Sequence, residues 1–150
     1  MFERILIATD GSKFSEKAAK VGIELAKLSG GKVIIVYVAD ISKYVSSAGL
    51  IPPFGGVSPD AINDVVASIR ETGEKATLQV NELARASGVI SERQIVEGNP
   101  PSEILRIAED EKIDTIVMGS IGKTGLEKFL IGSVAEKVVH NSKLPVLIVR

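Results

Sequence analysis

The sequence predicts an α/β domain in which a doubly wound parallel sheet of five strands carries helices on both faces. Short apolar runs alternate along the chain with segments whose apolar residues recur at helical spacing. The runs themselves do not alternate polar with apolar residues, which is typical of strands covered on both faces. Strands that alternate with helices are joined by right-handed crossovers and pair in parallel. With 150 residues and neither a linker nor an internal repeat, the chain is expected to form one domain, 1–150.

A short apolar run and the segment that follows it indicate the first strand and helix. Residues 4–10 read Arg-Ile-Leu-Ile-Ala-Thr-Asp, a run too brief for a helix that leads into a turn-forming Asp-Gly pair. Small and apolar residues then recur at helical spacing until Gly30 and Gly31, which predict the end of the helix. The β-branched residues at 32–39 predict the second strand.

A loop and a long helix are predicted next. Residues 46–59 are rich in Gly, Pro and Ser and show no periodicity, so we expect a loop there. Ser58 is placed to be an N-cap, with Pro59 at the first helical position. The helix is expected to end before Gly88, and its apolar stripe consists of Ile62, Val65, Ile69, Ala76, Val80 and Leu83.

The second half of the chain continues the alternation with shorter elements. Each apolar run is again separated from the next by a segment with helical spacing. In order, the sequence predicts a short strand around Ile95 and Val96, a helix opened by Asn99 and Pro100, a strand at 115–118, a helix at 133–141 and a strand at 146–149.

The overall composition excludes several classes of function. A formal net charge of −1 provides no basic patch for nucleic acid. No apolar run approaches the roughly 20 residues that a membrane span requires. The absence of cysteine excludes disulfides and thiolate metal sites, and His140, the single histidine, excludes a histidine-rich centre. We therefore expect a protein of the cytoplasm without a metal site of its own.

The position of a ligand can be inferred from the predicted sheet. Open parallel sheets bind ligands beyond the carboxyl ends of their strands, at the point where the strand order reverses. If the first strand is central and flanked by the second and fourth, that point lies between the first and the fourth. Asp10 ends the first strand and Gly119 ends the fourth, so the two ends are expected to face one crevice.

The segment between the fourth strand and the last helix is unusually rich in glycine. Four glycines fall within fourteen residues, at positions 119, 122, 125 and 132. Glycine allows backbone N–H groups to approach an anion closely. Gly132 and Ser133 then open a helix, whose free N–H groups and dipole favour a phosphate. The segment therefore predicts a phosphate site with two walls.

Part of this segment looks like a Walker A loop, but that interpretation is excluded. Residues 119–124 read Gly-Ser-Ile-Gly-Lys-Thr, but a Walker A loop needs a glycine where this chain has Val117, inside the strand. Lys123 and Thr124 therefore receive no P-loop role, although both lie close enough to contact a phosphate. Lys123 could equally be a solvated surface lysine. No Gly-x-Gly-x-x-Gly follows the first strand, which disfavours a classical NAD site.

The same glycines carry a family resemblance. Gly119-x-x-Gly122, nine residues and then Gly132-Ser133 match the pattern G-2X-G-9X-G-(S/T) of the ATP-binding branch of the universal stress protein family. The opening Ile-Leu-Ile-Ala-Thr-Asp-Gly-Ser and the closing Lys-Leu-Pro-Val-Leu-Ile-Val also resemble that family. The resemblance implies the strand order 3-2-1-4-5 and a Rossmann-like, adenine nucleotide alpha hydrolase-like fold. One departure is Ile121, where many relatives carry histidine.

The resemblance also implies a set of ligand contacts. Adenine and ribose would lie near Ala8, Asp10 and Val38. The phosphates would lie against the glycine segment and the start of the last helix, at Gly119, Ser120, Gly122, Lys123, Thr124, Gly132, Ser133, Val134 and Ala135.

Structural roles compete with some of these assignments. Asp10 could simply form the turn into the first helix, since Asp-Gly-Ser is common in turns. Ser133 and Glu136 have the spacing of a capping box, which we expect to coexist with phosphate binding. For the glycines the alternative is a flexible loop without a ligand.

The last strand predicts a partner. In the implied order it is a sheet edge, and its apolar residues lack the charges that discourage edge pairing. The resemblance likewise implies a homodimer through this strand, formed by Val146, Leu147, Ile148 and Val149.

The leading hypothesis is an ATP-binding protein that acts as a nucleotide-dependent sensor or regulator in the stress response, with Mg²⁺ held through the phosphates. No catalytic residue is assigned, because hydrolysis needs cationic stabilisation and no arginine lies near the glycine segment. One alternative is a slow ATPase or adenylyl-transfer enzyme, and another is an interaction module that binds no nucleotide. The stimulus, the downstream partner and the preference among ATP, ADP and AMP stay open.

Overall fold

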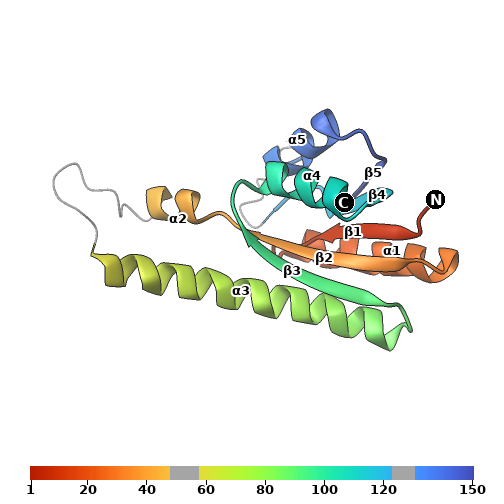
Figure 1. The fold of residues 1–150 in the computed structure, drawn as a ribbon, viewed down its shortest axis with the longest axis horizontal. Helices are drawn as coiled ribbons and strands as arrows, with labels where there is room; N and C mark the ends of the chain where they lie inside the picture. Colours follow the sequence, from red (N-terminus) through yellow and green to blue (C-terminus); the bar gives the residue numbers. More distant parts are fainter. Residues whose placement is uncertain (48–57, 123–130) are drawn as a thin grey trace.

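The computed structural model describes residues 1–47, 58–122 and 131–150, which form a three-layer α/β domain (Figure 1). Its five strands pair in parallel in the order β3-β2-β1-β4-β5, as predicted. β1 is therefore central, with β2 on one side and β4 on the other. The strands are β1 (Arg4–Ala8), β2 (Lys32–Ala39), β3 (Ser91–Glu97), β4 (Thr115–Gly119) and β5 (Val146–Val149).

Helices cover both faces of this sheet, which explains the continuous apolar runs of the strands. One face packs against α1 (Lys13–Ser29) and α3 (Pro59–Ala86), and the other against α4 (Pro100–Asp110) and α5 (Ser133–Asn141). Neighbours along β1 bury their side chains in opposite layers, because successive residues of a strand point to opposite faces. Ile5 and Ile7 join the α1 side of the core, whereas Leu6 joins the α4 side.

The helix ends confirm several signals in the sequence. The N-cap of α1 was not among these signals: it is Ser12, whose side chain accepts from the Ser15 N–H at 3.2 Å. Gly30 ends that helix with φ +71°, a left-handed conformation that favours glycine. Ser58 caps α3, accepting from the Ala61 N–H at 3.1 Å.

One helix was not predicted. α2 (Ile41–Ser47) follows β2 and includes the first two residues of the predicted loop at 46–59. Its start does carry a recognisable signal, because Asp40 Oδ1 accepts from the Lys43 N–H at 3.1 Å. The helix is too short to show an apolar stripe, which is why periodicity missed it. Residues 48–57 of the predicted loop lie outside the described residues.

β3 also differs from its prediction, since it is a full seven residues long rather than a short strand around its apolar pair. Its polar residues concealed it from a search for apolar runs, and as an edge strand it tolerates them. Within the described ranges, no helix is long and apolar enough to cross a membrane.

Candidate functional site

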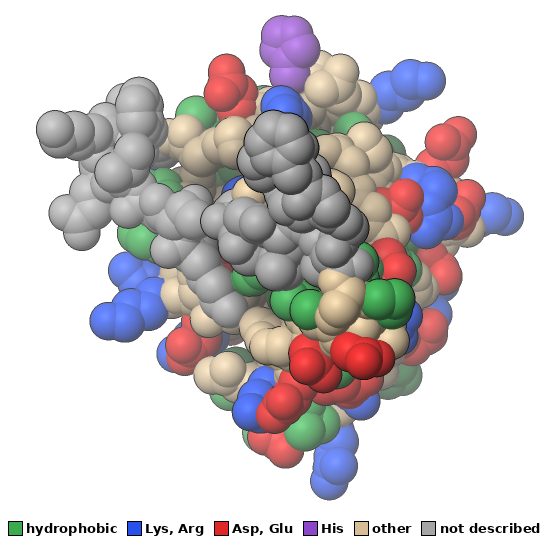
Figure 2. All heavy atoms as spheres, turned by 90° about the vertical axis from the view of Figure 1, so that its left-hand side faces the viewer, with side chains coloured by type: hydrophobic (Ala, Val, Ile, Leu, Met, Phe, Trp, Pro, Cys, Tyr) green, Lys and Arg blue, Asp and Glu red, His purple; other side chains and the backbone are tan. Residues whose placement is uncertain are grey.

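A cleft of about 840 Å³ lies at the carboxyl end of the sheet, the end that Figure 2 faces. Its volume falls in the range of pockets that bind small organic ligands. The walls come from the ends of β1, β2 and β4 and from the first turn of α5. It therefore occupies the point where the strand order reverses, between β1 and β4.

The cleft collects the residues that the sequence singled out, although they come from distant parts of the chain. Lys123 and Thr124 lie outside the described residues. Every other predicted contact lines the cleft: Ala8, Asp10, Val38, Gly119, Ser120, Gly122, Gly132, Ser133, Val134 and Ala135.

Among the described residues, nothing pairs with the backbone edge that the end of β2 presents to the cleft. Pairing of β1 with β2 stops at Ala8 and Val36, where the Thr9 N–H donates to the Val36 carbonyl at 2.9 Å. Val38 lies two residues further on and points its N–H and C=O to the same side. If β1 continued as far as Gly11, the Gly11 N–H would donate to the Val38 carbonyl. Instead, the Gly11 N–H donates to Thr9 Oγ1 at 3.2 Å. The Val38 backbone thus offers a donor and an acceptor side by side.

Asp10 follows β1 and lies beside the segment that follows β4. Its Oδ1 accepts from the Ser12 N–H at 2.9 Å, so the predicted role in the turn is confirmed. Its other oxygen faces the glycine segment, since a Cβ atom at Gly122 would lie 2.8 Å from Asp10 Oδ2. Glycine at 122 therefore lets the backbone after β4 approach this carboxylate.

The opposite end of the cleft is formed by two backbone segments that are bonded to each other. The Gly132 N–H donates to the Ser120 carbonyl at 2.5 Å, and the Ser120 N–H donates to the Val149 carbonyl at 2.8 Å. A Cβ atom at Gly132 would lie only 3.1 Å from that Ser120 oxygen, so glycine permits the close approach. The arrangement holds the start of α5 against the end of β4.

The predicted capping box is wrong. Gly132 is the N-cap of α5, and it has no side chain with which to cap the helix. Ser133 is instead the first helical residue, and it is exposed. The first N–H groups of a helix lack partners in the helix itself. Within the described ranges, no acceptor is found for the N–H groups of α5 that precede Glu136, so they are open to water or to an anion in the cleft.

Several lining residues were missed by sequence analysis. They include Tyr37 on β2 and Lys43 and Tyr44 on α2. Burial, together with the nearby Tyr44 and the Asp10 carboxylate, raises the pKa of Tyr37 from 10.0 to about 12. An alternation count along β2 could have shown that Tyr37 faces away from Val38, but only the fold places α2 beside the cleft.

The charged lining residues do not assemble a metal centre of their own. In the part of the chain that the structure describes, no three His, Asp or Glu side chains are grouped so as to hold a metal ion.

Known proteins share this architecture. The universal stress protein MJ0531 of Methanocaldococcus jannaschii is 39% identical over 151 residues, and the match covers 100% of this chain and 83% of MJ0531. The structure of MJ0577 from the same organism superposes with a TM-score of 0.82 at 33% identity, covering 99% of this chain and 96% of that one. A universal stress protein solved in complex with cAMP is 27% identical, with a TM-score of 0.64 and coverage of 99% and 96%.

The match to the family is complete. A family model described as the universal stress protein family covers residues 1–150. The strand order and the structural relatives agree on an adenine nucleotide alpha hydrolase-like fold. The chain belongs to the universal stress protein family.

Proposed function

We propose that this protein binds an adenine nucleotide, ATP with Mg²⁺, in the cleft at the carboxyl end of the sheet. The observation that carries the proposal is that one cleft holds two backbone surfaces for which the described part of the chain provides no partner, the edge of Val38 and the amides at the start of α5. The first suits the donor and acceptor edge of a base, and the second suits phosphates. The relative that was solved with cAMP supports an adenine nucleotide as the ligand.

The residues present fit such a ligand. The glycines at 122 and 132 keep side chains away from the places where the backbone must come close. Mg²⁺ would be bound by phosphate oxygens and water, because it binds few protein ligands in most nucleotide sites. We assign the protein a regulatory role in which nucleotide occupancy is the signal, and its location in the cytoplasm stays a prediction.

Ser133 offers a way to test the phosphate site without disturbing the fold. It is exposed at the first position of α5, so Ser133→Glu places a negative charge where phosphates are expected. A carboxylate at a helix N-terminus stabilises the helix, so the variant should fold at least as well as the wild type. In calorimetry, we expect ATP to bind more than tenfold more weakly and adenosine to bind unchanged.

The matched control is Ser133→Gln, which has nearly the same size as the glutamate variant and no charge. Its affinity for ATP should stay within about threefold of the wild type, because only charge repulsion is removed. Equal losses of ATP and adenosine in the glutamate variant would place the phosphates elsewhere.

We also propose that two copies pair through β5. This strand is a sheet edge, and Leu147 is 38% exposed on it. An uncharged, apolar edge invites pairing, and the same strand can meet itself about a two-fold axis. Leu147→Lys should shift the protein from dimer to monomer in sedimentation while ATP still binds. A wild-type protein that sediments as a monomer at micromolar concentration contradicts this proposal.

A further inference from the structure

Asn99 lines the cleft in addition to beginning a helix. It is the N-cap of α4, and its Oδ1 accepts from the Ser102 N–H at 3.4 Å and from the Ser102 hydroxyl at 2.9 Å. A backbone N–H can only donate, so the amide atom that faces it is the oxygen and not the nitrogen. The two hydrogen bonds therefore fix which way round the amide stands, and they occupy its acceptor.

The Nδ2 group of Asn99 is the half of the amide that the helix does not use. Among the described residues, none accepts a hydrogen bond from this group. An amide nitrogen donates and does not accept. A ligand in the cleft therefore meets a donor at Asn99, and the ligand atom that binds there has to be an acceptor.

The backbone of Asn99 is held as firmly as its side chain. Pro100 restricts the residue before it to extended conformations, and Asn99 has φ −82° and ψ 119°. The Gly98 N–H donates to the Ala39 carbonyl at 3.1 Å, which extends the pairing of β3 with β2 past the end of β3. Asn99 therefore has a fixed position near the end of β2, so little conformational freedom is lost when a ligand binds to it.

This position is the end of the cleft that lies farthest from the proposed phosphate site. Across the sheet the strands follow one another in the order β3, β2, β1 and β4. Asn99 follows β3, the Val38 edge belongs to β2, and the amides proposed to bind phosphate belong to α5, which follows β4. In a nucleotide the base and the phosphates lie at opposite ends, with the ribose between them. The donor at Asn99 is therefore placed for the base.

We propose that Asn99 recognises the base of the bound nucleotide, by donating a hydrogen bond from Nδ2 to a ring nitrogen of adenine. This inference rests on the proposed function. The N–H and C=O groups of Val38 suit one ring nitrogen of adenine together with its amino group. The remaining ring nitrogens are acceptors that Val38 leaves free, and Asn99 supplies a donor for one of them.

The experiment is Asn99→Ser, which removes the amide donor and keeps the cap, because serine ranks with asparagine as an N-cap. The thermal midpoint should stay close to that of the wild type. The net value of one hydrogen bond corresponds to a loss of roughly fivefold in affinity. We expect this loss in calorimetry for both ATP and adenosine, and no loss for inorganic tripolyphosphate.

Two further variants separate recognition from capping. Asn99→Asp keeps the shape of the side chain and the cap, but its carboxylate repels the lone pair of a ring nitrogen, so adenosine should lose at least as much affinity as in Asn99→Ser. Asn99→Ala loses the cap as well as the donor. It should unfold at a lower temperature than Asn99→Ser and bind adenosine with the same affinity.

Analogues of adenosine identify the acceptor. In 1-deazaadenosine, 3-deazaadenosine and 7-deazaadenosine, a C–H group replaces one ring nitrogen. For one of the three, the wild type should lose more affinity than Asn99→Ser, because the variant has no bond to that nitrogen left to lose. A nitrogen that binds to Val38 gives equal losses in both proteins.

Each outcome decides something. Unchanged affinity of Asn99→Ser for ATP and adenosine, with a wild type that binds, overturns this inference and leaves the proposed function intact. Equal losses in wild type and variant for all three analogues overturn the ring nitrogen as the acceptor. A fivefold loss for tripolyphosphate overturns the placement at the base. A wild type that binds neither ATP nor adenosine overturns the proposed function and the inference together.

Discussion

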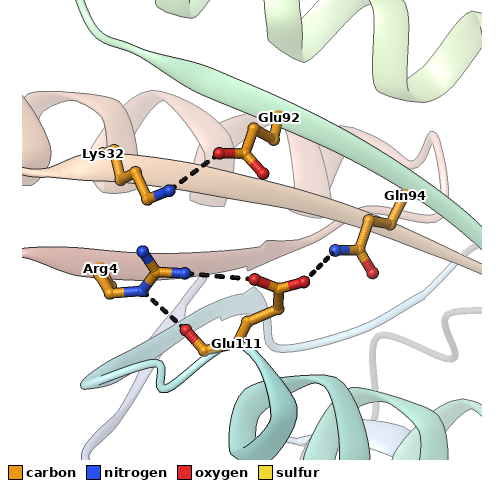
Figure 3. A network of polar contacts seen from close by, with 5 residues as sticks. All are labelled: Arg4, Lys32, Glu92, Gln94 and Glu111. Atoms are coloured by element: carbon orange, nitrogen blue, oxygen red, sulfur yellow. Dashed lines mark hydrogen bonds and ion pairs between the residues drawn. The ribbon is translucent and has the colours of Figure 1, made fainter.

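The two ends of the sheet are built in opposite ways. At the amino end, side chains close the backbone: the Asp114 carboxylate accepts from the N–H groups of Phe2, Glu3 and Arg4 at 3.1, 2.8 and 3.2 Å. Figure 3 shows the polar network beside it. Glu111 accepts from Arg4 at 3.2 Å and from Gln94 at 2.8 Å, and Lys32 pairs with Glu92 at 2.8 Å.

At the carboxyl end the backbone is left open. The edge of Val38 continues past the last rung of the β1–β2 ladder, and α5 begins without a side-chain cap. Two backbone surfaces thus face the cleft rather than each other. Under the proposed function, the amino end contributes stability and the carboxyl end binds the nucleotide, so we expect changes at one end to leave the property of the other largely unaffected.

The largest effect is expected at the amino end, for Asp114→Ala. Three backbone N–H groups lose a charged acceptor, and hydrogen bonds to charged groups are individually worth about 1.5–3 kcal/mol. Water replaces part of this loss, so the free energy of unfolding should fall by about 3 kcal/mol in urea titrations. Affinity for ATP should not change in calorimetry at a temperature where the variant is folded. A variant as stable as the wild type would contradict the claim that Asp114 at the amino end of the sheet contributes stability.

A smaller effect is expected at alkaline pH, from Tyr37. Tyrosine is charged only when deprotonated, and the folded protein disfavours that form, raising the pKa from 10.0 to about 12. The unfolded chain therefore loses the proton first, so this contribution to stability is complete below pH 10 and is lost between pH 10 and pH 12. Its upper limit is about 2.7 kcal/mol, and solvent in the cleft reduces it.

The measurement compares urea unfolding of wild type and Tyr37→Phe at pH 9 and pH 11, so that the other alkaline groups cancel in the difference. Between these two pH values the wild type should lose more stability than the variant, because the unfolded tyrosine begins to lose its proton near its pKa of 10.0 whereas the folded one keeps it up to about 12. Equal losses would mean that the folded protein does not disfavour the deprotonated phenol, which contradicts its raised pKa.

The smallest effect is expected for Lys32→Gln. The ammonium group lowers the pKa of Glu92, first through the hydrogen bond and then through its charge. Both side chains are partly exposed, and such pairs contribute about 0.2–1 kcal/mol. The loss in urea titrations should shrink further as salt is added, because salt screens surface charges. A loss above about 2 kcal/mol would mean that the network in Figure 3 acts as one unit.

Most of the fold could be predicted from local patterns. The apolar runs identified the buried strands because β1, β2 and β4 are covered on both faces, and Ser58 and Gly30 marked helix ends through their own chemistry. The strand order came from the family resemblance, not from the pattern. The glycine-lined wall of the cleft could also be predicted, because Gly122 and Gly132 lie so close to Asp10 and Ser120 that a side chain at either position would be crowded.

What the sequence did not reveal depends on tertiary structure. Tyr37 is identified as a cleft residue only once Gly73, 36 positions later in the chain, is placed against its ring. α2 is seven residues long, too short for an apolar stripe to be detected. The capping box failed because its spacing is necessary but not sufficient: the extended conformation that a cap needs belongs to Gly132, one residue earlier.

The most direct test of this account is calorimetry of the wild-type protein with ATP and Mg²⁺, combined with thermal unfolding of the same samples. The account predicts saturable binding at one site per chain. At a hundredfold excess of ATP over its Kd, the folded state should be stabilised by about 2.7 kcal/mol. Neither heat of binding nor a thermal shift at millimolar ATP would contradict the central claim that the open end of the sheet is a nucleotide site.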